Sequence, residues 1–354
     1  MASPKTILIR TDTNSCLGMG HFSRMIAFGQ LCKSSGFEVH YILSTENQYI
    51  LDSIYDEDFI VHNYLDKFKW NSREDRNFLL NVANKIKTNW IVIDGEQFDL
   101  KYEKSIKKNY KLMRVVDFSI KHTYADLLFD QNYGAENNSY LVEPYAVVLL
   151  GIRYLLLRKE FHKARLDNSL DFGYKDSTKV NRILVTLGGG SEITDLVNRK
   201  IIKAISKLKE DNLSITIVLG PFSQNIDSLK ELADRLSPKI QMENSVDNMA
   251  EKMSNYSLAI LSGGSIMWEA AYMGIPFMGV ALTKKQKPYL EKLSKEGLCI
   301  DLGWYDDLTI EKMTKNISYF IKNQSTLKKN IYNFGKLNFA QNEELLTSLN
   351  RSNK

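Results

Sequence analysis

The sequence predicts an α/β protein made of two doubly wound parallel sheets in tandem. Short apolar segments alternate with stretches of helical periodicity, as expected for parallel strands joined by crossover helices. The alternation stops in a polar, turn-rich segment at 163–180 and then restarts, which indicates two domains. Glycine-rich loops follow three of the apolar segments at the point where a helix begins. Ligand sites of such domains lie at the carboxyl ends of the strands.

Composition is that of an ordinary globular protein. The chain has 354 residues, enough for two hydrophobic cores, and 44% of them are hydrophobic and 25% charged. The net charge of +5 is compatible with an anionic small ligand or a peripheral membrane contact. Because no basic helix or aromatic-studded basic sheet stands out, we expect no nucleic-acid partner.

The cysteines and the N-terminal segment predict a cytoplasmic protein. Cys16, Cys32 and Cys299 are odd in number and irregularly spaced, which argues against a disulfide framework or a zinc site. The chain starts Met-Ala-Ser-Pro-Lys and runs directly into a strand pattern, so we expect no signal peptide. No apolar run approaches the ~20 residues of a membrane span. We also expect neither a metal ion nor another cofactor.

The N-terminal domain is predicted to span 1–162. It opens with a strand at 6–10, and a polar loop leads from that strand into the first helix. Further strands are predicted at 37–43, 59–61, 90–94, 112–117, 127–130 and 147–150, with a helix at 73–88.

The C-terminal domain is predicted to span 181–324, between a linker at 163–180 and a helical tail at 325–354. Its strands are predicted at 182–187, 214–219, 257–261 and 277–281. Helices are predicted at 194–208, 285–296 and 308–350, and another ends at Gly274, a usual helix stop.

The loop Gly18-Met19-Gly20 and the histidine after it form the strongest candidate site. The loop joins the first strand to the first helix, so His21 falls in the first turn of that helix. Glycines let backbone approach a ligand closely, and free N–H groups at a helix start attract anions. The positive end of the helix dipole disfavours an imidazolium, so we expect His21 to stay neutral and to accept a proton.

Two more glycine loops lie in the C-terminal domain, at Gly188-Gly189-Gly190 and Gly263-Gly264. Neither matches the phosphate loop that ends in Gly-Lys-Ser/Thr. The first loop, at 18–20, lacks the third glycine of a dinucleotide fingerprint. Three such loops in two domains favour a ligand held in the cleft between the sheets.

Further motifs occur in a fixed order along about residues 5–305. They are Arg10-x-Asp12, Gly18-x-Gly20-His21-x-x-Arg24, Ile93-Asp94, Asp117, Asp130-Gln131-Asn132, Arg153-Tyr154, Gly188-Gly189, Gly263-Gly264-Ser265-x-x-Trp268-Glu269, Gly274-x-Pro276 and Gln286. In this order they resemble the UDP-2,4-diacetamido-2,4,6-trideoxy-beta-L-altropyranose hydrolases of pseudaminic acid biosynthesis, which are relatives of MurG-type glycosyltransferases. The resemblance implies a GT-B fold, with two Rossmann-like doubly wound parallel-sheet domains facing a cleft.

The resemblance also implies which residues bind and react. The diphosphate would lie on the loop at 263–265, Glu269 would bind the ribose hydroxyls, and backbone near Met249 would face the uracil. His21 would act as general base on a water that attacks the anomeric carbon, with release of UDP and free sugar. The residues assigned to substrate and UDP are Asp12, Gly18, Gly20, Arg24, Asp94, Gly188, Gly189, Met249, Gly263, Gly264, Ser265, Glu269, Lys285 and Gln286.

The chain departs from these hydrolases at two places near the reacting sugar. It has Asp94-Gly95-Glu96 where they have Asp-His-Tyr or Asp-x-Tyr, and Lys285-Gln286 where they have Asn-Gln. Lys285 would add positive charge near the phosphates or a sugar carboxylate, or would simply face solvent. For Asp12 and Arg24 the plain alternative is that they pair with each other or cap the helix.

Three hypotheses about function remain open. The first is a metal-independent, monomeric hydrolase that cleaves a UDP-linked amino sugar in nonulosonic acid biosynthesis. The second is a GT-B glycosyltransferase that uses a UDP-amino sugar as donor. The third is a sugar-nucleotide sensor without catalysis, against which the presence of His21 in its loop argues.

Overall fold

The computed structural model describes residues 5–15, 17–65, 68–117, 122–167, 181–210, 212–335, 339 and 342–350. Contacts between Cα atoms divide the chain into two compact units. Unit 1 comprises Met1–Thr13, His21–Arg158 and Asn338–Lys354, and unit 2 comprises Asn14–Gly20 and Lys159–Leu337. Of the linker predicted at 163–180, residues 168–180 lie outside the described part, and 163–167 form the end of a helix.

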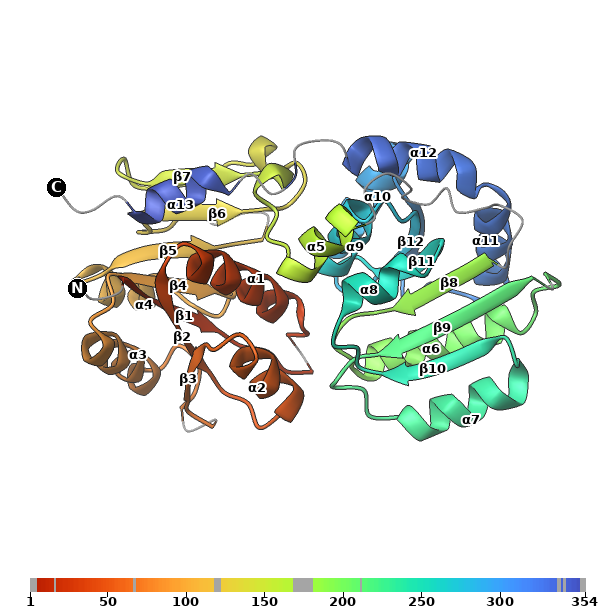
Figure 1. The fold of residues 1–354 in the computed structure, drawn as a ribbon, viewed down its shortest axis with the longest axis horizontal. Helices are drawn as coiled ribbons and strands as arrows, with labels where there is room; N and C mark the ends of the chain where they lie inside the picture. The colour runs from red at the N-terminus through yellow and green to blue at the C-terminus, as the bar shows by residue number, and fades with distance from the viewer. Residues whose placement is uncertain are drawn as a thin grey trace. The chain divides into compact units, whose positions relative to one another are not determined.

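Unit 1 contains a seven-stranded sheet in the order β3-β2-β1-β4-β5-β6-β7, and every neighbouring pair is parallel (Figure 1). Its strands are β1 Lys5–Thr11, β2 Phe37–Leu43, β3 Ile60–Asn63, β4 Trp90–Asp94, β5 Lys111–Val115, β6 Leu127–Asp130 and β7 Val147–Leu150. Its helices are α1 Gly20–Ser34, α2 Gln48–Tyr55, α3 Arg73–Ile86, α4 Leu100–Lys107, η1 Ala135–Asn137, η2 Ile152–Tyr154 and α13 Glu343–Asn350. The central strands β1 and β4 are buried over almost their whole length, as parallel strands covered on both faces should be.

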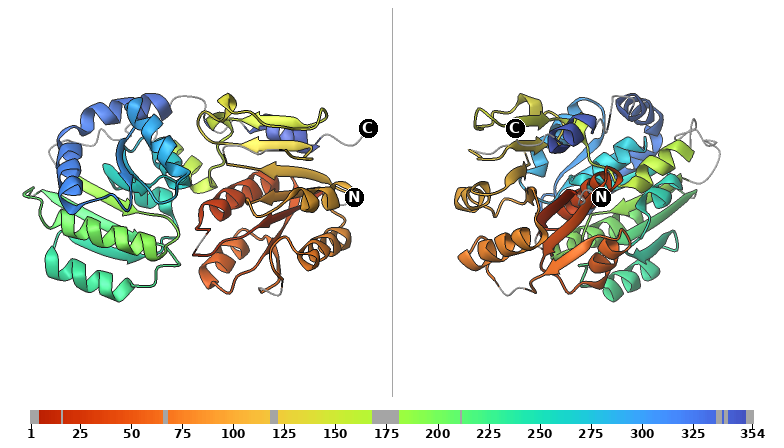
Figure 2. Two further views of the ribbon diagram at one scale, coloured as in Figure 1. Left: turned by 180° about the vertical axis from the view of Figure 1, so that it is seen from behind. Right: turned by 60° about the vertical axis from the view of Figure 1, so that its left-hand side comes forward.

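Unit 2 contains a six-stranded parallel sheet in the order β10-β9-β8-β11-β12-β13 (Figure 2). Its strands are β8 Asn181–Thr186, β9 Leu213–Leu219, β10 Ile240–Asn244, β11 Leu258–Ser262, β12 Phe277–Ala281 and β13 Ile300–Trp304. Its helices are α5 Lys159–Asp167, α6 Glu192–Ile205, α7 Ile226–Leu236, α8 Met249–Ser254, α9 Ser265–Tyr272, α10 Gln286–Lys295, α11 Ile310–Lys322 and α12 Gln324–Gly335.

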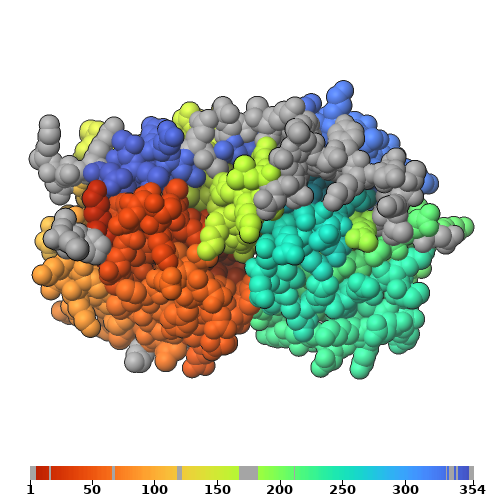
Figure 3. All heavy atoms as spheres, viewed as in Figure 1, coloured from red at the N-terminus to blue at the C-terminus, as the bar shows by residue number. Residues whose placement is uncertain are grey.

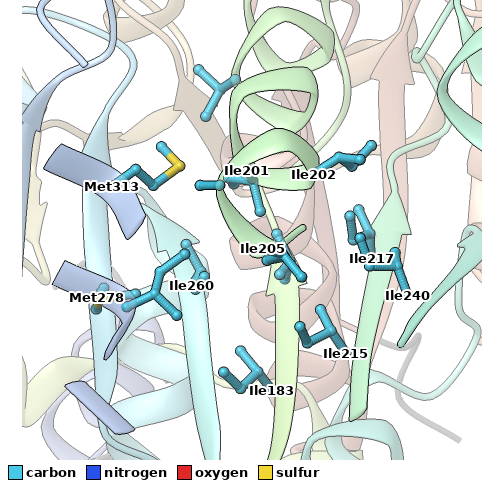
Figure 4. Packing of buried hydrophobic residues seen from close by; sticks show 14 of the residues in the cluster. Ile183, Ile201, Ile202, Ile205, Ile215, Ile217, Ile240, Ile260, Met278 and Met313 are labelled. Atoms are coloured by element: carbon cyan, nitrogen blue, oxygen red, sulfur yellow. The ribbon is translucent and has the colours of Figure 1, made fainter. Parts of the chain in front are cut away.

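The core of unit 2 shows why the sequence pattern works. Ile201, Ile202 and Ile205 on one face of α6 are at most 1% exposed and lie over strand residues such as Ile183 and Ile215 (Figure 4). Their spacing along the helix places them on one face, and the strands supply branched side chains to the same layer. The prediction of two doubly wound parallel-sheet domains is confirmed.

The end of the chain differs from the prediction. The helical pattern expected over 308–350 forms three helices, α11, α12 and α13. The last of these belongs to unit 1, where the Trp90 indole N–H donates a 3.0 Å hydrogen bond to the Leu349 carbonyl. In the space-filling view, α13 lies on the first residues of unit 1 (Figure 3). No helix among the described residues is long and apolar enough to cross a membrane.

Candidate functional site

Most of the predicted site residues lie after the strands at which the strand order reverses, whereas Met249 follows β10 and Lys285 and Gln286 follow β12. In unit 1 the order reverses between β1 and β4, and in unit 2 between β8 and β11. At such a point the loops after two neighbouring strands diverge, and ligands of open α/β sheets bind there. Asp12 and His21 follow β1, and Asp94 is the last residue of β4. Among the described residues, no group of three or more histidine, cysteine or acidic side chains is placed to hold a metal ion.

His21 lies at the start of α1 and is held from one side. Its Nδ1 is 2.8 Å from Asp94 Oδ1 and 2.8 Å from Arg24 Nη2. The side chain is 19% exposed, whereas that of Asp94 is fully buried. Both contacts reach the same ring nitrogen, which can donate to Asp94 or accept from Arg24 but cannot do both, so one hydrogen bond orients the imidazole on its Nδ1 side.

Arg24 binds two carboxylates at once. Its Nε donates to Asp94 Oδ2 at 2.7 Å, and its Nη1 donates to Asp117 Oδ1 at 2.6 Å. Its Nη2 donates to Asp94 Oδ1 at 2.5 Å and to Asp117 Oδ2 at 3.1 Å. Arg24 is 6% exposed, so its guanidinium is committed to these partners. The structure therefore makes Arg24 a holder of carboxylates, and it does not support a direct contact of its guanidinium with substrate.

The charges in this group stabilise one another. Burial alone would raise the pKa of Asp94, but the charges of Arg24 and His21 and the hydrogen bonds from both residues outweigh it and hold this pKa well below its usual range. Burial alone would lower the pKa of Arg24, but Asp117 and Asp94 raise it well above the ordinary value. Asp94 is therefore an anion and Arg24 a cation near neutral pH.

The surroundings of Nδ1 favour one tautomer of His21. Arg24 Nη2 already has acceptors on Asp94 and Asp117, so it does not need the imidazole as a third. A carboxylate oxygen can only accept, and a charge-assisted bond from Nδ1–H to Asp94 is the stronger choice. We assign the proton to Nδ1, which leaves Nε2 with its lone pair.

A series of hydrogen bonds continues from Asp117 along the carboxyl ends of the neighbouring strands. Asn132 Nδ2 donates to Asp117 Oδ1 at 2.9 Å and to Asp130 Oδ1 at 2.8 Å. The Tyr140 hydroxyl donates to Asp130 Oδ2 at 2.9 Å. Our site assignment did not include Asp117, Asn132 or Tyr140. The signal for the first two was present, because Asp117 ends one predicted strand and Asn132 follows another, whereas Tyr140 lies in a segment without periodicity.

Asp12 belongs to a separate buried group. Its carboxylate is 2.6 Å from Arg10 Nη1, and the Tyr64 hydroxyl lies 3.3 Å from its Oδ1. Arg10 is fully buried, and its Nη2 also donates to Tyr64 at 2.7 Å. Asp12 thus pairs with Arg10, and the alternative in which Asp12 pairs with Arg24 is wrong. Asp12 is itself 2% exposed and supports the loop that leads to His21.

The loop before His21 turns as its glycines predict. Gly18 has φ +71°, and its N–H donates to the Asn14 carbonyl at 2.8 Å. Gly20 is the first residue of α1. A left-handed residue closes the turn, and glycine occupies that conformation without steric cost.

In unit 2 the loop after β8 is packed against backbone. Gly188 has φ +91° and Gly190 φ +93°. A Cβ on Gly190 would lie 2.4 Å from the backbone nitrogen of Ser223, in the loop after β9. Ser191 and Thr194 then form a capping box that starts α6. Gly188 lies near β11, where a Cβ would be 3.7 Å from Ser262 Oγ.

The loop after β11 leads into α9 through Gly263 and Gly264. Gly264 is the N-cap, with no side-chain cap, so the first turn of α9 presents backbone N–H groups. A Cβ on Gly263 would lie 2.9 Å from Cβ of Gln286, so this loop rests on the start of α10. Ser265 is the first residue of α9, and Glu269, one turn later, is 7% exposed.

Three further predicted residues of unit 2 occupy helix starts. Met249 is the first residue of α8 and is 9% exposed. Gln286 Oε1 accepts hydrogen bonds from the N–H groups of Leu282 at 2.8 Å and Thr283 at 3.3 Å, so this side chain fixes the loop after β12. Lys285 is the N-cap of α10, and its side chain is exposed. Desolvation lowers the pKa of Lys285 below its usual value.

Comparison with known proteins indicates a glycosyltransferase-like family and fold. Residues 183–345 match the family model of the glycosyltransferase family 28 C-terminal domain. The chain is 31% identical over 341 residues to the uncharacterized protein MJ1062 of Methanocaldococcus jannaschii, covering 91% of this chain and 67% of that protein. It is 26% identical over 182 residues to the spore coat polysaccharide biosynthesis protein SpsG of Bacillus subtilis, 51% of each chain.

Among solved structures, MurG of Acinetobacter baumannii superimposes with a TM-score of 0.66. The match covers 98% of this chain and 99% of MurG at 13% identity, which shows a shared fold.

Proposed function

The chain belongs to the family of the MJ1062 protein, a GT-B, glycosyltransferase-like family, and on that premise we propose that it hydrolyses a UDP-linked sugar. The products are UDP and the free sugar. The substrate class we propose is a UDP-linked amino sugar of the 2,4-diacetamido-trideoxy type, used in nonulosonic (pseudaminic-type) acid biosynthesis.

One observation carries the proposal: His21 is oriented by a buried carboxylate. Asp94 holds Nδ1 at 2.8 Å, and Arg24 holds Asp94. An imidazole fixed in this tautomer accepts a proton at Nε2, and its carboxylate partner stabilises the imidazolium that forms. A histidine that only filled space would not need a buried carboxylate partner that is itself held by a buried guanidinium.

The reaction then follows from this arrangement. His21 Nε2 takes a proton from water, and the water oxygen forms a bond to the anomeric carbon. The bond between that carbon and the diphosphate oxygen breaks, and its electron pair leaves with UDP. The base contributes ~10²–10⁴-fold to the rate. Asp94 acts through His21, because it is fully buried and does not reach a substrate.

Unit 2 supplies the nucleotide site in this proposal. The N–H groups at the start of α9, after Gly263 and Gly264, would bind the leaving diphosphate with the positive end of the helix dipole. Glu269 would bind the ribose, and backbone near Met249 the uracil. Because amide groups and the helix dipole carry the leaving charge, we propose that no metal ion is needed.

Transfer to an acceptor is the second candidate, and the glycosyltransferase match over residues 183–345 favours it. The same base would then deprotonate an acceptor hydroxyl. The two candidates differ only in the nucleophile, so the distinguishing quantity is UDP release in the absence of any acceptor.

The test is to incubate the purified protein with a panel of UDP-amino sugars and follow UDP and free sugar by NMR. Hydrolysis predicts equal amounts of UDP and reducing sugar without an acceptor, and the same rate after treatment with EDTA. UDP release that starts only when an acceptor is added would instead establish the transferase. Tight binding of UDP-sugars with no turnover under either condition would contradict both. The predicted cytoplasmic location and monomeric state stay predictions.

A further inference from the structure

Asp117 is the second carboxylate that Arg24 holds, and it lies just beyond the end of β5. Its side chain is 21% exposed, whereas that of Asp94 is fully buried. The guanidinium of Arg24 thus joins a buried carboxylate to one that reaches the surface. His21 contacts this guanidinium at 2.8 Å, so all four side chains form one cluster, which we call the Arg24 cluster.

The charge of the Arg24 cluster is unbalanced when the imidazole is neutral. Arg24 contributes one positive charge, and Asp94 and Asp117 contribute two negative charges. A proton taken up by His21 brings the sum to zero. The net negative charge of the cluster therefore favours uptake of one proton, and the imidazole of His21 is the group that takes it up.

Among the described residues, the charged neighbours of the cluster on β5, on α4 and after β6 do not supply the missing charge. Arg114 on β5 lies 3.4 Å from Glu103 on α4, so that pair is neutral overall. The segment after β6 adds Asp130, whose carboxylate accepts from Asn132 and Tyr140. Of the described residues on these elements, the charged and titratable groups near the cluster are Arg114, Glu103, Asp130 and Tyr140, and their net charge is again negative.

We propose that Asp117 is a positioning residue that sets the proton affinity of His21 through its charge and its hold on Arg24. This inference rests on the proposed role of His21 as a base. It adds a residue outside the His21–Asp94 pair. It also explains why Arg24 binds a second carboxylate, that of Asp117, in addition to Asp94.

The electrostatic coupling between the two residues supports this role. Burial alone would raise the pKa of Asp117, but Arg24 outweighs it, and the charge of His21 lowers this pKa further. Coupling between two titrating groups is reciprocal. Since a protonated His21 favours the Asp117 anion, the Asp117 anion must favour protonated His21 by the same free energy.

Asp117→Asn tests the proposal, because the amide oxygen can still accept from Arg24 Nη1 and Asn132, while the charge and the acceptor for Arg24 Nη2 are lost. We expect the pH midpoint of the His21 imidazole, followed by NMR, to fall. The acid limb of the pH–rate profile moves down by the same amount, and kcat falls several-fold with KM little changed, because a weaker base accepts the proton less readily.

Asp126→Asn is the matched control. The Asp126 side chain is 22% exposed and paired with Lys107. Asp126 directly precedes β6, so it lies at the amino ends of the strands, whereas Asp117 lies at their carboxyl ends. We expect no movement of the midpoint in this variant. Asp117→Glu keeps the charge and is expected to keep the midpoint of the wild type. Asn132→Ala removes a donor from Asp117 and not the charge, and it moves the midpoint upward.

An unchanged midpoint in folded Asp117→Asn, or equal shifts in the Asn and Glu variants, would overturn the proposal. If Asp117→Asn fails to fold by circular dichroism, Asn132→Ala decides, and a downward or absent shift contradicts us. The imidazole titration needs no substrate. It therefore tests Asp117 even if the wild type turns over no UDP-sugar, the result that would refute the proposed function.

Discussion

Arg24 and Lys285 are two cations of the proposed site in opposite surroundings. Arg24 is buried between carboxylates that raise its pKa, so its charge is permanent and serves to hold other side chains. Lys285 is at the start of α10, where desolvation lowers its pKa. The ammonium of Lys285 is thus less stable than an ordinary one, and an anionic ligand such as a diphosphate would stabilise it.

The residue-level prediction concerns UDP binding at alkaline pH. Because the pKa of Lys285 is lowered, this lysine loses its charge below pH 10.5, the usual value, and UDP affinity falls as pH rises through that range. We expect a loss of several-fold for one exposed charged contact. Lys285→Arg stays charged, so it removes this part of the loss, and the part that remains is due to ionisation of the uracil.

Isothermal titration calorimetry with UDP between pH 7 and 10.5 checks this, with Lys284→Arg as the neighbouring control. Identical alkaline losses in wild type and Lys285→Arg would remove Lys285 from the diphosphate site.

At the scale of elements, the glycine loop after β8 depends on how closely two loops approach. Gly188 and Gly190 both have positive φ, but only a Cβ added at Gly190 would meet the backbone of the 220–223 loop. Alanine at Gly188 is destabilising only because alanine disfavours a positive φ. Alanine at Gly190 has the same cost and must also displace the backbone near Ser223.

We therefore expect Gly190→Ala to destabilise unit 2 more than Gly188→Ala, by roughly 1–3 kcal/mol. The lower unfolding midpoint of Gly190→Ala is measurable by differential scanning calorimetry. Equal midpoints for the two variants would contradict the packing described here.

The sequence predicts those elements whose residues are buried on both faces. Strands such as β4 and β11 are continuous apolar runs, and the structure buries all of their residues. Strand β10, with the sequence IQMEN, has no such run because it lies at the sheet edge and buries only Ile240. Helix α13 could not be placed from sequence, since its return to unit 1 depends on tertiary contacts such as that of Trp90.

The same distinction applies to the candidate site. The position of His21 after a glycine loop and of Asp94 at a strand end could be predicted, because strand order brings such ends together. The partners of Arg24 could not be predicted, because the two carboxylates are 70 and 93 residues away along the chain and only the sheet aligns them. We predicted that Asp12 binds substrate, but in the fold its carboxylate forms an ion pair with Arg10.

At the scale of the whole molecule, the two units carry different parts of the proposed reaction. Unit 1 holds His21, the proposed base, and the carboxylates around it, and the α9 and α10 starts that we assign to UDP lie in unit 2. Each unit has its own sheet and its own buried core. Loss of the base should therefore abolish chemistry and leave nucleotide binding intact.

The most direct test compares turnover and UDP affinity in the wild type and His21→Ala, with His122→Ala as a histidine control from the same unit. The account predicts that His21→Ala releases UDP from its UDP-sugar ~10²–10⁴-fold more slowly, with the UDP dissociation constant changed less than about threefold. His122→Ala should match the wild type in both. Turnover by His21→Ala at the wild-type rate would show that His21 is not the base.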